Sequence, residues 1–206
     1  MTTIEIGRLL RAATSGFVVG CRVNQLDSPS FGALVRVPLE RNYQVYGLVH
    51  DIHIDDDGLV RQLVTAETMD AGSLEAVIAD NRLNRNVPVE VSVLAVGYRQ
   101  DGRIFHLLPP RPPLSLDKIY LCDENEVCQF TAVGRFGYFR HLLRAVDLPV
   151  GELLAAHFRQ ASLAHRQNGD PDWASRATQE LIILLRDDYQ TLMSVLAALG
   201  DTINEF

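Results

Sequence analysis

A proline-rich segment at residues 109–113 divides this sequence into two halves of different pattern. It reads Pro-Pro-Arg-Pro-Pro, and so many prolines can continue neither a strand ladder nor a helix. The segment favours an extended polyproline conformation. It therefore predicts a stiff strap between two folding units, residues 1–115 and residues 116–206. The alternative is that the prolines themselves dock on an aromatic groove.

The half before the strap has the pattern of short β-strands. Its β-rich segments are separated by turn signals and fall at residues 4–9, 16–23, 31–37, 45–54, 88–96 and 104–108. Asp101-Gly102 is typical of a hairpin turn. Short strands punctuated by glycine favour a small closed barrel. Apolar residues near helical spacing also predict a helix inserted at about residues 72–86.

The half after the strap is expected to be mostly helical. Two short strands are predicted first, at residues 118–122 and 127–131. Asp170-Pro171 is typical of a helix start, and Gly200 is typical of the glycine that follows a helix end. Together they predict one long helix to about Leu199. The expected fold class is α+β, with an N-terminal barrel followed by a helical domain.

Apolar side chains in the expected long helix step by three and four residues, which is a heptad seam. The seam consists of Ile182, Leu185, Tyr189, Leu192, Leu196 and Leu199. Other apolar residues lie outside it, so more than one face of the helix needs cover. Two interpretations remain open: a central helix in a small bundle, or a face that binds a partner protein or a second copy of the chain.

The charge of the chain argues against strong nucleic-acid binding. The formal net charge is −7, and neither half is basic, whereas binding a phosphate backbone depends on an excess of Lys and Arg. Arg82 and Arg85 stand among three asparagines and could hold phosphate or carboxylate groups. The alternative for these two arginines is the polar end of a helix.

Catalytic and cofactor-binding motifs do not emerge from the sequence. Lys118 is the only lysine, and it lacks the upstream glycines that a nucleotide-binding P-loop requires. The three cysteines lack metal-ligand spacing. His50, Asp51 and His53 form the most tempting polar cluster, but an acidic surface turn explains it as well. We therefore expect no enzyme activity, no cofactor and no bound metal.

The expected location is the cytoplasm. The first residues lack the basic and apolar stretches of a secretory signal, and no apolar run is long enough to span a membrane. A reducing compartment would keep the cysteines as free thiols.

The glycine-punctuated strands resemble those of the HerA–ATP synthase (HAS) barrel family. The similarity rests on residues 6–10, 16–23, 31–35 and 45–49 and extends over about residues 4–108. The resemblance implies a barrel used for assembly and docking, found in DNA-translocating ATPases, rotary ATP synthases and some partner nucleases. In this chain helices replace the motor domain, so the resemblance implies an adaptor and transfers no catalytic residue.

Three hypotheses for function follow. The first is a non-catalytic interaction or assembly module, which could act on a HerA-type translocase or another ATPase ring, with an ATPase or nuclease as partner and homo-oligomers possible. The second is a DNA-associated accessory protein that binds weakly or indirectly through Arg82 and Arg85. The third is an enzyme with an unrecognised site around His50, Asp51 and His53.

Overall fold

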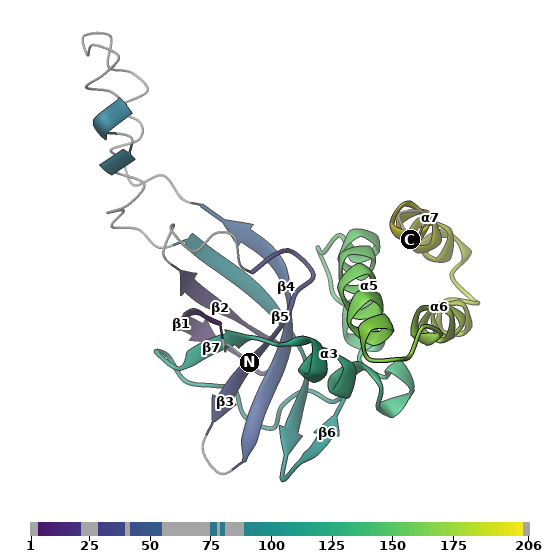
Figure 1. The fold of residues 1–206 in the computed structure, drawn as a ribbon, viewed down its shortest axis with the longest axis horizontal. Helices are drawn as coiled ribbons and strands as arrows, with labels where there is room; N and C mark the ends of the chain where they lie inside the picture. Colours follow the sequence, from purple (N-terminus) through teal and green to yellow (C-terminus); the bar gives the residue numbers. More distant parts are fainter. Residues whose placement is uncertain are drawn as a thin grey trace.

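A β-barrel followed by a group of helices makes up the described part of the chain (Figure 1). The computed structural model describes residues 4–21, 29–39, 42–54, 75–77, 79–80 and 89–203. The strands within these ranges are β1 (Glu5–Ala12), β2 (Gly16–Cys21), β3 (Leu34–Leu39), β4 (Tyr43–His53), β5 (Val89–Gln100), β6 (Arg103–Phe105) and β7 (Lys118–Leu121). The expected α+β class and the N-terminal barrel are confirmed.

The strands close into a ring in which every pairing is antiparallel. Their order is β2-β1-β7-β3-β4-β5, and the pairing of β2 with β5 closes the ring. β6 continues the sheet beyond β5 through the predicted turn, where Asp101 and Gly102 both have positive φ. β7 follows the strap, yet it fills the position between β1 and β3. The barrel is thus complete only when residues on both sides of the strap are present.

Apolar side chains that alternate along the strands fill the barrel interior, and all six strands of the ring contribute. The members include Leu9, Phe17, Val19, Val35, Val37, Val45, Val49, Val91, Val93 and Ile119. A second apolar set points away from the interior and packs beneath the helices: Leu34, Tyr46, Leu48 and Val96. This double burial explains why residues 45–49 are apolar almost throughout, since both faces of β4 are covered.

Gly47 sits where the barrel interior has no room for a side chain. A Cβ atom at this position would lie 2.4 Å from Val93 Cγ1 and 2.9 Å from the backbone oxygen of Leu94. The first contact could relax only by moving a packed core side chain, and the second involves the neighbouring strand itself. Glycine is therefore required by close strand approach.

The helices lie together on one side of the barrel, with α6 and α7 farthest from the sheet (Figure 1). They are α3 (Glu124–Thr131), the short 3-10 helix η2 (Gly134–Phe136), α4 (Phe139–Leu143), α5 (Val150–Gln167), α6 (Trp173–Leu184) and α7 (Tyr189–Ile203). The strand predicted at residues 127–131 is wrong, because this segment belongs to α3. A capping box between Asp123 and Glu126 starts that helix and outweighs its β-rich composition.

The single long helix predicted after Asp170 is also wrong, because the chain breaks between α6 and α7. Asp188 accepts hydrogen bonds from the backbone and hydroxyl groups of Thr191, at 3.1 and 2.7 Å. It thereby caps a new helix. α6 starts after Asp172 rather than at Asp170, and α7 runs past Gly200, so Gly200 is not the residue that ends it.

The strap contacts the barrel, and the inserted helix is described only in part. Arg111 contacts Tyr43 of β4: its carbonyl accepts a 3.4 Å hydrogen bond from the tyrosine hydroxyl, and its guanidinium lies 5.2 Å from the ring centroid. The strap thus runs along the barrel, whereas its docking on another protein stays untested. Residues 75–77 and 79–80 are helical, and the rest of the expected insertion lies outside the described residues.

Candidate functional site

The junction of α6 and α7 exposes a group of large apolar side chains. Its members, which we call the α6–α7 surface, are Ile182, Ile183, Leu184, Tyr189 and Met193. Tyr189 is the most exposed at 72%. Ile182, Ile183 and Leu184 end α6, and Tyr189 and Met193 lie in the first part of α7. Isolated exposed apolar residues are ordinary, and here five of them fall within residues 182–193.

The six candidate seam residues do not form one face. Leu185 and Leu199 are buried in the helical core, and Leu192 and Leu196 are partly buried against it. Ile182 and Tyr189 belong to the α6–α7 surface. The continuous heptad is therefore wrong, since its residues lie on two helices. The bundle-core interpretation accounts for four of them, and partner contact by Ile182 and Tyr189 stays a prediction.

The two candidate arginines and part of the acidic turn cannot be placed. Arg82, Arg85 and residues 55–58 lie outside the described residues. Asp51 and His53 are both exposed and separated by the half-buried Ile52, which matches their expected common face on β4. His50 departs from this alternation because the register between β4 and β5 shifts there.

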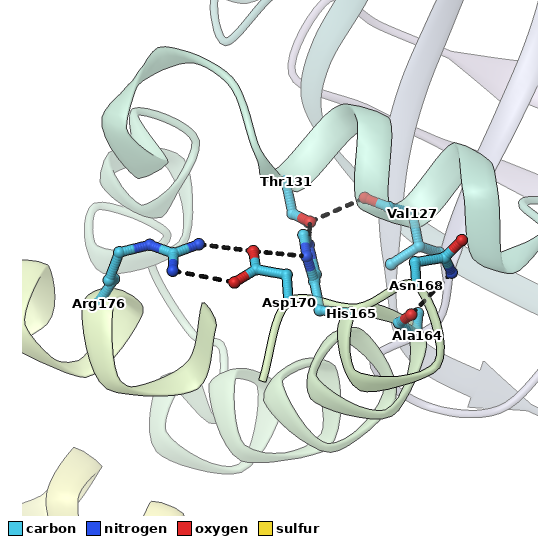
Figure 2. Close-up of polar contacts among 7 residues, drawn as sticks. All are labelled: Val127, Thr131, Ala164, His165, Asn168, Asp170 and Arg176. Atoms are coloured by element: carbon cyan, nitrogen blue, oxygen red, sulfur yellow. Dashed lines mark hydrogen bonds and ion pairs between the residues drawn. The ribbon is translucent and has the colours of Figure 1, made fainter. Parts of the chain in front are cut away.

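A polar network that sequence reasoning missed joins α3, α5 and α6 (Figure 2). His165 places Nε2 2.7 Å from the Thr131 hydroxyl and Nδ1 3.3 Å from Asp170. Asp170 in turn accepts two hydrogen bonds from Arg176, at 3.0 and 2.6 Å. These bonds lower the pKa of the Asp170 carboxyl, whereas burial lowers the pKa of His165 against the pull of Asp170.

The order of hydroxyl, imidazole and carboxylate is that of a nucleophile with its base. Burial argues against this use, because Thr131 is 1% exposed and His165 is 3% exposed. The hydroxyl also lies 2.8 Å from the carbonyl of Val127 in its own helix. A substrate has no approach to the oxygen that would attack it. The network instead fixes α3 and the loop before α6 against α5.

A second buried histidine ties the barrel to the helices. Nδ1 of His157 in α5 lies 3.4 Å from the carbonyl oxygen of Gly32. Because a carbonyl can only accept a hydrogen bond, Nδ1 carries the proton and donates. Nε2 of His157 therefore accepts a hydrogen bond from the Tyr138 hydroxyl at 3.0 Å. His106 is similarly buried, and its Nε2 donates to the carbonyl of Phe130 at 2.9 Å. Burial lowers the pKa of each ring to about 4. Both histidines are therefore neutral parts of the core near pH 7.

The cysteines are buried or half-buried thiols. Cys21, Cys122 and Cys128 are free, and burial raises the pKa of all three, that of Cys21 to about 11. Such thiols are poor nucleophiles.

Across the described ranges, no three His, Cys, Asp or Glu side chains are grouped to hold a metal ion. No described helix is both long and apolar enough to cross a membrane.

Fold and surface together define an α+β protein with a closed barrel, a helical layer and an apolar outer junction. No protein-family model matches this chain, and no curated protein matches it significantly. The closed six-stranded antiparallel barrel is compatible with the barrel domain expected from the strand pattern.

Proposed function

We infer that this chain is a non-catalytic protein-binding module that uses the α6–α7 surface to contact its partner. The observation that carries this proposal is the outward position of five large apolar side chains at one helix junction. Protein interfaces are built around buried apolar and aromatic anchors, and tyrosine is enriched among the residues that contribute most to binding. Tyr189 is the natural anchor because it is the most exposed of the five.

The remaining architecture suits a rigid carrier for this surface. The polar groups that resemble catalytic residues are buried and engaged in holding helices together. Arg176 and Asp170 brace the start of α6, so the junction is presented by fixed helices. Preorganised surfaces lose less conformational entropy when they bind. An adaptor role, with the barrel as a scaffold and the helices as the contact layer, follows from this division.

The resemblance to HAS barrels favours an ATPase ring or a nuclease as the partner. In that family the barrel serves assembly, so a barrel that carries a helical layer with an exposed apolar surface would dock on such a partner. Free and protonated thiols suit a reducing compartment, which supports the cytoplasm as the location.

The test is photo-cross-linking in the native cell. A photoreactive phenylalanine at position 193 is expected to give a discrete cross-linked product, and Ile183→Glu with Tyr189→Glu is expected to abolish it. Leu163→Glu is the matched control, because Leu163 is also exposed but lies on α5, away from the junction. Light scattering of the purified chain distinguishes a second copy from a different partner. Equal cross-linking in the double variant would overturn the proposal.

A further inference from the structure

Two neighbouring cavities form a groove between the barrel and the loop that joins α4 to α5. The larger has a volume of about 560 Å³ and the smaller about 460 Å³. His50 and Leu148 line both of them, so they are adjacent parts of one depression, which we call the His50 groove. It involves none of the residues of the α6–α7 surface, so an inference drawn from it is independent of the function proposed above.

A bulge in the sheet creates the groove's centre. Val49 pairs with Val93 and Asp51 pairs with Ser92, so His50 is the extra residue on β4. Bulges re-aim side chains and are frequent next to functional sites. The His50 side chain is half-buried, and burial lowers its pKa although Asp51 and a hydrogen bond to its own backbone act in the opposite direction.

The two cavities differ in chemistry. Apolar groups dominate the larger one, which is lined by Phe17, Leu94 and Val146 among others. Val146 is 81% exposed, so most of its apolar side chain faces solvent. The smaller cavity is lined by the exposed carboxylates of Asp51 and Asp147 beside apolar groups. Asp147 has no ion pair or hydrogen bond from its side chain within the described ranges.

We propose that the His50 groove binds an extended segment of a partner protein that carries a bulky apolar side chain and, two residues later, a basic one. An extended chain directs residues i and i+2 to the same side, about 6.6 Å apart. The apolar side chain fills the larger cavity and the basic side chain meets Asp147 and Asp51. The net charge of −7 adds to the attraction for a basic segment.

The test uses short peptides of defined sequence and the purified full chain. The probe is acetyl-Gly-Phe-Ser-Arg-Gly-amide, titrated while backbone amide signals are followed by two-dimensional NMR. Shifts are expected at His50, Val146 and Leu148. Replacing Arg by Gln in the peptide is expected to weaken binding about twofold to fivefold, the range of an exposed ion pair. Replacing Phe by Ala is expected to weaken it further, because the larger cavity is left empty.

A matched pair of variants assigns the charge contact. Asp147→Asn is expected to remove the preference for Arg over Gln. Asp101→Asn is expected to preserve it, because Asp101 is likewise an exposed aspartate with positive φ but lies in the β5–β6 turn. Asparagine tolerates this backbone conformation, so both variants should fold. Absence of shifts at millimolar peptide, shifts at other residues, or an equal effect of both variants would each refute the proposal.

Discussion

Acid should destabilise this protein through His106 and His157, well above the pH at which carboxylates titrate. Both rings are buried, and burial lowers the pKa of each to about 4 from the ordinary 6.5. Below pH 6.5 the unfolded chain binds protons at these histidines while the folded chain does not. The stabilisation is therefore fully present above pH 6.5 and is lost as the pH falls from 6.5 to 4.

The magnitude follows from proton linkage. Between pH 7.5 and 5.5, a histidine with these two pKa values loses about 1.3 kcal/mol of folding free energy, so the pair loses about 2.7 kcal/mol. Other histidines with lowered pKa, such as His165, add in the same direction. The free energy of unfolding is measured by urea titration at both pH values. Fluorescence of Trp173 reports it, since this single tryptophan is fully buried.

The variant His157→Gln isolates one of the two contributions. A glutamine can donate to Gly32 and accept from Tyr138, yet it does not titrate. We expect the loss between the two pH values to shrink by about 1.3 kcal/mol, whatever the variant's stability at pH 7.5. An unchanged loss in His157→Gln would refute the reasoning.

Three substitutions test the fold by urea unfolding. Gly47→Ala should lower the free energy of unfolding by about 1–3 kcal/mol through overpacking of the barrel, and a neutral effect would contradict the close strand approach. Gly200→Ala should raise the free energy of unfolding by up to about 1 kcal/mol, because position 200 is helical and a Cβ there meets nothing within 4 Å. A lower free energy of unfolding would instead support the helix end expected at Gly200 from the sequence. Asp188→Ala should cost about 1 kcal/mol by removing the cap of α7, whereas Asp187→Ala, also exposed, should change little.

The barrel could be predicted from the sequence because its signals are local. Strand segments alternate, and Asp101-Gly102 marks a hairpin whose two positive φ angles the structure contains. The helices after the strap were harder to predict from the sequence. Residues 127–131 carry β-rich composition, but the capping box at Asp123 decides their state. The apolar steps from residue 182 to 199 continue through the break at Asp188, so periodicity alone cannot reveal it.

The candidate sites depend on contacts distant in sequence, which explains why most of them were missed. His50 is a bulge only by reference to its pairing with β5, and its groove needs the α4–α5 loop as a second wall. His165, Thr131 and Arg176 come from three helices. Their residue types are ordinary, so no local pattern marks them. Ile182 and Tyr189 were named only as members of the heptad seam, because the sequence did not predict the helix break beside which they are exposed.

The late position of β7 in the chain has a consequence for how the protein is made. During synthesis β1 and β3 emerge with one edge each unpaired, and those edges meet their partner only after residue 121 has left the ribosome. A fragment that ends at the strap would keep both edges exposed, and open strand edges promote aggregation. The smallest stable fragment of this barrel must therefore extend beyond the prolines, and thus beyond the boundary expected at residue 115.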